Sequence, residues 1–267
     1  MAEKVMLKLE NVCKTFNPGS VNEKSALKNI DLEVYEGDFI TVIGGNGAGK
    51  STLMNAICGT FPIDAGKIIL NGDDITRLPE YKRAKYLGRV FQDPMLGTAP
   101  NMEIEENLAL AYRRGKLRSL MPRITRQERA FYREQLARLE LGLEDRLTVK
   151  VGLLSGGQRQ SLTLLMATMK KPDLLLLDEH TAALDPRTAA KVLGLTEEIT
   201  AENKLTTIMI THNMMDAIRC GNRLIMMQEG RVIYDVSGEE KKSLSVRDLL
   251  EKFRESGGEI NDRMVLS

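Results

Sequence analysis

The feature that most constrains the fold is the octapeptide GGNGAGKS at residues 44–51, which lies between an aliphatic segment and a helical one. The segment at 39–43 is typical of a buried strand, and 50–58 has the apolar spacing of a helix. The octapeptide fits the pattern G-x-x-x-x-G-K-[ST] in a strand–loop–helix context, where backbone N–H groups cradle phosphates. In this pattern Lys50 reaches the β- and γ-phosphates and Ser51 binds Mg²⁺. The alternative is a glycine-rich turn with an accidental lysine, which the surrounding strand and helix disfavour.

Aliphatic segments alternate with helical ones along most of the chain. Strands are expected at 5–9, 30–34, 39–43, 68–70, 89–91, 174–177, 207–210, 224–227 and 232–234. Helices are expected at 50–58, 126–141, 156–170, 187–201, 214–220 and 246–254. This alternation indicates an α/β fold with a mostly parallel sheet and with ligands at the carboxyl ends of its strands. The first two strands are expected to add an antiparallel edge.

One interval breaks the alternation. Between residues 93 and 152 we find no convincing strand, which indicates a helical insertion between two halves of the α/β core. The expected organisation is one domain at 1–240, with its core at 1–92 and 161–240 and its helical subdomain at 93–160, followed by a short helical tail at 241–267.

Composition excludes several classes of protein. The formal net charge of the 267 residues is +1, which disfavours a nucleic-acid partner. Three widely spaced cysteines and two histidines argue against a disulfide framework and against a zinc enzyme. No run approaches the roughly 20 apolar residues that a membrane span requires, and the N-terminus lacks the apolar core of a signal peptide.

A pair of acids ends the aliphatic segment LLLLDE at 174–179. Neighbouring residues of a strand point to opposite faces, so Asp178 and Glu179 can take different tasks. Asp178 suits Mg²⁺, and Glu179 is then available to orient or deprotonate an attacking water. The alternative is a solvated acidic pair at the end of a strand. The phosphate loop elsewhere in the chain disfavours this alternative.

The segment LSGGQRQ at 154–160 opens an expected helix, with Ser155 as its N-cap. Gly156 and Gly157 in the first turn weaken a helix by about 1 kcal/mol each. Their advantage is access, because a helix N-terminus without side chains leaves its N–H groups open to an anion.

Together, GGNGAGKST, LSGGQRQ and LLLLDEHTAALD in this order resemble the ATPase subunits of ATP-binding-cassette (ABC) transporters. The resemblance extends over about 5–236, and its LSGGQ element is specific because P-loop kinases and GTPases lack it. It implies a P-loop NTPase with a RecA-like core, an inserted helical subdomain, and ATP and Mg²⁺ as cofactors. It also implies a head-to-tail dimer, in which each LSGGQ segment faces the P-loop of the other copy.

Site residues are carried over from this resemblance one at a time. It assigns contacts with ATP to Phe16, Gly44, Gly45, Asn46, Gly47, Ala48, Gly49, Lys50, Ser51, Thr52, Ser155, Gly156, Gly157, Gln158 and Asp185. It assigns Mg²⁺ to Ser51, Gln92 and Asp178, and catalysis to Glu179, His212, Gln92 and Lys50.

Several of these residues have a structural alternative. Phe16, implied to stack on adenine, could instead be a packed aromatic at a strand end. Asp185 could serve as the cap of the helix that begins at Pro186. His212 could be structural, and His180, which stands where the family often has proline, receives no role.

The expected partners are a second copy of the chain, an integral membrane permease and an extracytoplasmic substrate-binding protein, with no nucleic acid. The implied function is ATP hydrolysis at the cytoplasmic side of the membrane, by a peripheral subunit that powers import of a small solute such as an amino acid. The alternative is a soluble ABC ATPase of an assembly system, such as iron–sulfur cluster assembly.

The helical insertion also carries eight basic residues between 113 and 133 against one acid. They are Arg113, Arg114, Lys116, Arg118, Arg123, Arg126, Arg129 and Arg133. Contact with anionic lipid is one interpretation, and a solvated face of the helix and loop is the favoured one.

Overall fold

The computed structural model describes residues 4–115 and 124–255. The chain divides into two compact units. Unit 1 consists of Met1–Arg83 and Lys204–Ser267, and unit 2 consists of Ala84–Asn203. The α/β fold expected from the sequence is confirmed, since parallel strands alternate with helices in both units.

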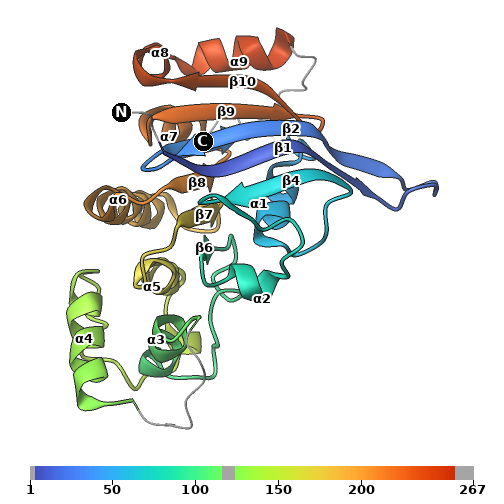
Figure 1. Ribbon diagram of the computed structural model, residues 1–267. Coiled ribbons are helices and arrows are strands. Elements are labelled where there is room, and N and C mark those ends of the chain that lie inside the picture. Colours follow the sequence, from blue (N-terminus) through green and yellow to red (C-terminus); the bar gives the residue numbers. More distant parts are fainter. Residues whose placement is uncertain (1–3, 116–123, 256–267) are drawn as a thin grey trace. The chain divides into compact units, whose positions relative to one another are not determined.

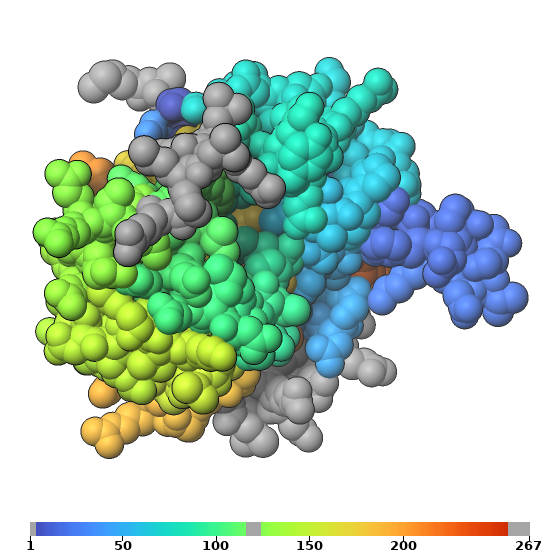
Figure 2. Space-filling view, turned by 90° about the horizontal axis from the view of Figure 1, so that it is seen from below, coloured from blue at the N-terminus to red at the C-terminus, as the bar shows by residue number. Residues whose placement is uncertain are grey.

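Unit 1 contains an antiparallel sheet built on the N-terminal hairpin. Its strands are β1 (Val5–Phe16), β2 (Lys24–Tyr35), β4 (Ala65–Leu70) and β5 (Asp73–Asp74), in the order β2-β1-β4-β5. β1 is central because it pairs antiparallel with both β2 and β4. The antiparallel strands expected from the sequence therefore belong to a sheet with β4 and β5, separate from the sheet that contains the parallel strands of unit 1. Figure 2 shows the tip of the β1–β2 hairpin, in blue, standing clear of the neighbouring surface of unit 1.

Unit 1 also contains the strands that position the P-loop. β3 (Phe39–Ile43) pairs in parallel with β8 (Thr207–Ile210) on one side and β9 (Arg223–Gln228) on the other. β10 (Arg231–Ser237) pairs antiparallel with β9. All four residues of β8 and four of the five in β3 are buried, as continuous aliphatic runs predict.

The helices of unit 1 follow these strands in the chain. They are α1 (Lys50–Cys58), α2 (Glu80–Arg83), α7 (Met214–Arg219), α8 (Gly238–Ser243) and α9 (Val246–Glu255). In Figure 1 the two last helices lie along β10. Leu249 and Phe253 of α9 belong to a buried cluster with Ile43, Met214 and Met226. The C-terminal helix is therefore part of the core of unit 1.

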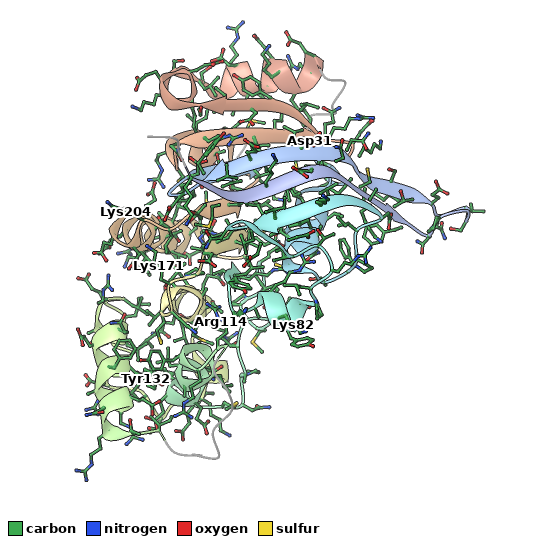
Figure 3. All side chains as sticks on the ribbon, viewed as in Figure 1. Asp31, Lys82, Arg114, Tyr132, Lys171 and Lys204 are labelled. Atoms are coloured by element: carbon green, nitrogen blue, oxygen red, sulfur yellow. The ribbon has the colours of Figure 1, made fainter. Side chains whose placement is uncertain are left out.

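Unit 2 is mostly helical around one parallel strand pair. Its strands are β6 (Leu87–Val90) and β7 (Leu174–Asp178), and its helices are α3 (Ile104–Tyr112), α4 (Arg126–Ala137), the short 3₁₀ helix η1 (Val151–Leu153), α5 (Gly156–Thr168) and α6 (Pro186–Asn203). Leu108, Tyr132, Leu136 and Leu162 belong to its buried cluster, and Figure 3 labels Tyr132 beside α4. Within the described part of 93–152 there is no strand, only an isolated bridge between Glu103 and Lys150, as the sequence predicts.

None of the helices in the described ranges is long and apolar enough to cross a membrane. The same residues contain no group of three or more His, Cys, Asp or Glu side chains arranged to hold a metal ion.

Candidate functional site

The P-loop at residues 44–51 connects β3 to α1 and depends on glycine at both of its ends. Gly44 has a φ of 152° and Gly49 a φ of 101°. A Cβ on Gly44 would lie 2.2 Å from the carbonyl oxygen of Met227 in β9, and a Cβ on Gly49 would lie 2.6 Å from that of Ala26 in β2. Because both obstacles are backbone atoms, any other residue would displace the loop. The strands thus hold in place a glycine-rich loop of the kind that cradles phosphates.

Lys50 places a cation inside this cradle. It is the first residue of α1, and only 6% of it is exposed. Its Nζ donates to the carbonyl oxygens of Gly44 at 2.7 Å and Gly45 at 3.1 Å. The first turn of α1 carries no acid, so the helix N-terminus and the ammonium both favour a bound anion.

The other residues of the loop differ in exposure. Asn46, Gly47 and Ser51 are exposed, Thr52 is half-buried, and Ala48 is buried. Ser51, expected to hold Mg²⁺, is therefore open to a ligand. All of the P-loop residues expected to bind ATP lie together in unit 1.

The opposite end of α1 is fixed by Arg83, which sequence reasoning missed. Its Nη1 donates to the carbonyl oxygens of Ala56 and Ile57, both at 2.8 Å, and its Nε to that of Leu78 at 2.8 Å. A buried cation at a helix C-terminus stabilises the helix dipole. α1 therefore has a phosphate loop at one end and a guanidinium at the other.

Phe16, expected to stack on adenine, ends β1. Its ring lies edge-to-face with Phe61, with centroids 5.2 Å apart and planes at 84°. The Nζ of Lys14 lies 5.5 and 5.6 Å from the two ring centroids and pairs with Asp64 at 2.8 Å. Phe16 is half-buried, so it keeps surface for a base while Phe61 fixes its orientation.

His212 follows β8, and both of its neighbours in the chain are held by hydrogen bonds. The Thr211 N–H donates to the carbonyl oxygen of Val42, and the Asn213 N–H to the hydroxyl of Thr211 at 3.1 Å. Asn213 also caps α7, since its side chain accepts from the N–H of Asp216 at 3.0 Å. These contacts fix the backbone around the half-buried His212 at the carboxyl end of a parallel strand.

The remaining predicted site residues lie in unit 2. Asp178 ends β7, and its Oδ2 lies 3.5 Å from Nη2 of Arg89 in β6. Both side chains are largely buried, at 15% and 14% exposure. The guanidinium of Arg89 also lies 4.4 Å from the ring centroid of Phe91. The predicted Mg²⁺ ligand thus has a protein cation as its neighbour, which the sequence did not reveal.

Glu179, the predicted catalytic acid, has a left-handed backbone with φ 47°. Such a conformation costs a residue other than glycine about 1–2 kcal/mol. It begins a turn in which the N–H of Ala182 donates to the Glu179 carbonyl oxygen at 3.0 Å. Strain of this kind persists where surrounding contacts enforce it, and it is frequent at functional sites.

His180 supplies one of these contacts. Its ring is fully buried, and Nε2 lies 3.0 Å from Oγ1 of Thr196 in α6. The Thr196 hydroxyl itself donates to the carbonyl oxygen of Val192 at 2.8 Å, so Nε2 is the donor toward Thr196. Burial lowers the pKa of His180 to about 4, which keeps the ring neutral.

Gln92, expected to sense Mg²⁺ and the attacking water, is exposed two residues beyond the end of β6. The preceding backbone is fixed by Gln160, whose Nε2 donates to the carbonyl oxygen of Phe91 at 3.2 Å. Met95 and Leu96 follow as exposed apolar side chains.

The LSGGQ segment forms the N-terminus of α5, as predicted. Ser155 accepts from the N–H of Gln158 at 3.3 Å, and the Gln158 side chain accepts from the N–H of Ser155 at 3.2 Å. A Cβ on Gly156 would make ordinary contact with Leu184 at 3.4 Å. A Cβ on Gly157 would lie 2.3 Å from Cγ2 of Thr188. Gly156 therefore leaves the exposed helix end bare, whereas Gly157 also allows α6 to pack closely.

Asp185 caps α6, which is the structural alternative considered from the sequence. Its Oδ1 accepts from the N–H of Thr188 at 3.1 Å, and its carbonyl oxygen accepts from the N–H of Ala189 at 2.8 Å. The hydrogen bonds from Thr188 lower the pKa of this carboxyl. The side chain is exposed, so capping leaves it accessible to a second subunit.

Much of the basic charge between 113 and 133 is used inside unit 2. Arg113 pairs with Glu128 at 3.0 Å, and Arg129 pairs with Glu105 at 2.5 Å. Arg114 donates to the carbonyl oxygens of Ala167 and Lys170, both at 3.4 Å. These contacts support a structural use of the charge over a lipid site. The other basic residues expected to contribute include Lys116, Arg118 and Arg123, which lie outside the described residues.

Comparison with known proteins places this chain among ATP-binding cassettes. Residues 27–182 match the family model described as ABC transporter. The chain is 45% identical over 249 residues to a tyrosine transport ATP-binding protein of Clostridioides difficile, covering 93% of this chain and 98% of that protein. It is 36% identical to the methionine import ATP-binding protein MetN 2 of Enterococcus faecalis, over 85% of this chain and 64% of that protein.

A solved structure has a closely similar fold. It is the dimeric post-hydrolysis state of an ATP-binding cassette bound to ADP and Pi, with a TM-score of 0.73 and 30% identity. The match covers 87% of this chain and 98% of that one. From its motifs, fold and relatives, the chain belongs to the ABC transporter family and is an ATP-binding subunit that couples ATP hydrolysis to transport.

Proposed function

We propose that this chain is the ATPase of an amino acid importer and that tyrosine is the first substrate to test. The observation that carries this proposal is the 45% identity to a tyrosine transport ATP-binding protein, which extends over 93% of the chain. The methionine import relative also supports an amino acid as cargo. The subunit would act at the cytoplasmic side of the membrane, bound to a separate permease, with an extracytoplasmic binding protein delivering the solute.

Two copies of the chain would form two ATP sites at a head-to-tail interface. In each site the P-loop of one copy holds the phosphates, and the N-terminus of α5 in the other copy completes the shell. The exposed Ser155 and Gly156 support this role, because they leave a helix N-terminus open to an anion from outside the subunit. The dimeric structure of a similar ATP-binding cassette bound to ADP and Pi supports a dimer of this chain.

Within each site, the residues would divide the work. Lys50 and the loop N–H groups hold the β- and γ-phosphates, Phe16 receives the adenine, and Asp185 acts toward the second copy. Glu179 orients the attacking water and accepts its proton, and His212 donates to the γ-phosphate.

Ser51, Gln92 and Asp178 would hold Mg²⁺, which neutralises the charge that develops on the phosphates. A small number of protein ligands suits Mg²⁺, since it binds substrate phosphates and waters as well. In this role the carboxylate oxygen of Asp178 would leave Arg89 and join the coordination shell of Mg²⁺.

The Glu179→Gln variant tests the proposed cycle. It keeps the shape of the side chain and removes the base, so ATP should bind and the dimer should persist. Light scattering with saturating ATP is expected to give twice the mass of the protomer, whereas Lys50→Ala in the same background should stay monomeric. A Glu179→Gln protein that remained monomeric with bound ATP would contradict the head-to-tail dimer.

The cargo is tested by uptake in cells that lack the chain. Labelled tyrosine should accumulate when the wild-type gene is returned and should not when Glu179→Gln is returned. Co-purification with a detergent-extracted permease should accompany uptake. Recovery with soluble scaffold proteins and no membrane partner would instead favour the assembly ATPase, a role that none of the relatives named above has.

A further inference from the structure

The N-terminal hairpin brings a second cation to the P-loop. Phe16 is the last residue of β1, Lys24 is the first of β2, and the two are direct cross-strand partners. The turn between them is closed by Glu23, whose Oε2 accepts from the N–H of Gly19 at 2.7 Å. This register fixes the position of Lys24 relative to the aromatic ring expected to receive adenine.

The side chain of Lys24 extends to the phosphate loop. Its Nζ lies 3.5 Å from the position that a Cβ on Gly47 would occupy. Gly47 has a φ of 77° and is exposed, so the ammonium lies at the open rim of the cradle. Lys50, by contrast, is buried within the loop and donates to its carbonyl oxygens. The two lysines therefore approach the loop from different sides.

Across residues 4–115 and 124–255, no carboxylate forms an ion pair with Lys24. Glu23, the preceding residue, accepts from the N–H of Gly19, and the Asp64 carboxylate pairs with Lys14. A cation at the rim of a phosphate cradle, with no carboxylate of the described residues paired to it, attracts a polyanion.

We propose that Lys24 is a nucleotide-binding residue, which donates from the hairpin to the polyphosphate of ATP. This inference rests on the proposed binding of ATP at the P-loop. One cross-strand pair then recognises both ends of the nucleotide, with Phe16 under the base and Lys24 on the phosphates. The β1–β2 hairpin would then contact both the adenine and the phosphates of the nucleotide.

The test compares Lys24→Gln with Lys24→Arg and with Lys82→Ala. Lys82 is an exposed lysine on α2, labelled in Figure 3, and serves as the control for loss of one surface charge. Affinities for ADP, for inorganic tripolyphosphate and for adenosine are measured by calorimetry or competition. Lys24→Gln should weaken ADP and tripolyphosphate by about tenfold, which corresponds to about 1.4 kcal/mol. Adenosine should bind to it as to wild type.

Further results support or overturn the proposal. Lys24→Arg should restore most of the ADP affinity, and the loss in Lys24→Gln should shrink in high salt because the rim is exposed to solvent. Equal weakening of adenosine and ADP would overturn the proposal, since Lys24 would then act by holding the hairpin. Unchanged ADP affinity in Lys24→Gln, with binding lost in Lys50→Ala, would overturn it while leaving the proposed ATP site intact. If wild-type protein bound no nucleotide, the proposed function would fail first.

Discussion

At the residue scale, a neutral buried histidine adjoins the acid proposed to activate water. His180 has no route to that water, because its ring is enclosed and its Nε2 is committed to Thr196. Its position next to Glu179, whose backbone is left-handed, assigns it a positioning role. By anchoring the turn to α6 it helps to hold a conformation that an isolated peptide would avoid.

This burial predicts a pH dependence of stability. The pKa of His180 is about 4 in the fold and about 6.5 when unfolded, so the unfolded chain binds more protons between these values. The contribution of His180 to the unfolding free energy is therefore fully present above pH 6.5 and is lost as the pH falls toward 4. We expect the unfolding free energy to drop by about 2 kcal/mol from this residue between pH 7.5 and 5.

Urea unfolding of wild type and His180→Gln isolates this contribution. Glutamine keeps a donor near the place of Nε2 and cannot titrate in this range, so the variant should show a flatter pH profile. Both proteins share the same carboxylates, whose effects cancel in the comparison. Parallel profiles from pH 7.5 to 5 would show that the buried ring is not the source.

The local structure around the predicted site residues could be predicted wherever a short motif specifies it. The strand–loop–helix context of the P-loop and the N-cap at Ser155 could be predicted because both depend on neighbours in the chain, while the roles of these residues toward ATP stay predictions. Phe61 and Arg89 were missed, since each reaches the site through a contact distant in sequence, with Phe16 or with Asp178. An arginine inside a strand looks the same in the sequence whether it faces solvent or a carboxylate.

At the element scale, α9 connects the C-terminal part of the chain to the P-loop. Val246, Leu249, Leu250 and Phe253 form one apolar stripe, and the helix packs into the core of unit 1 with it. A Cβ on Gly45 would lie 3.2 Å from Cζ of Phe253. The ring therefore supports the first turn of the phosphate loop directly.

Two truncations in α9 separate this support from general stability. Phe253→Ala and Leu249→Ala each remove a buried side chain from the same cluster, and each should cost about 3 kcal/mol of unfolding free energy. Only Phe253→Ala should also raise the Kd for ADP, by about fivefold, because it removes the side chain that lies beside Gly45. ADP affinities are measured by calorimetry. Equal affinities in the two folded variants would show that Phe253 does not support the P-loop.

The elements themselves were largely predictable. β3, β8 and α1 begin and end where their aliphatic or helical patterns do, because both faces of these strands are buried. β1 and β2 extend well beyond the apolar segments from which they were predicted, through polar residues that pair across the two strands. α2 and α8 have four and six residues, too few for a periodic pattern to be visible.

At the scale of the whole molecule, the predicted helical subdomain at 93–160 lies inside a larger compact unit, Ala84–Asn203. The larger unit includes β6, β7 and α6 as well, because α5 packs against both β6 and α6. This packing joins segments that are far apart in the chain. The order of strands and helices along a sequence does not predict such contacts. The predicted boundaries stay a prediction.

The head-to-tail dimer makes a prediction for mixed subunits. Lys50→Ala removes the P-loop lysine, and Gly156→Arg blocks the end of α5, where a Cβ meets no close contact and the Ser155 cap is kept. Each variant alone should lack ATPase activity. A mixed dimer pairs the intact P-loop of one variant with the intact α5 of the other, so an equal mixture should recover about a quarter of wild-type activity. A mixture as inactive as its components would contradict sites shared between copies.

The hydrogen bonds of Lys50 have a consequence for how the cycle ends. Its ammonium donates hydrogen bonds to the carbonyl oxygens of Gly44 and Gly45. Binding of a phosphate therefore replaces these hydrogen bonds with new ones to the phosphate. Departure of the product simply reverses that exchange, and the lysine folds back onto its own chain. Lys50 therefore has hydrogen-bond acceptors both with and without a bound phosphate. This arrangement favours rapid release of ADP over tight retention.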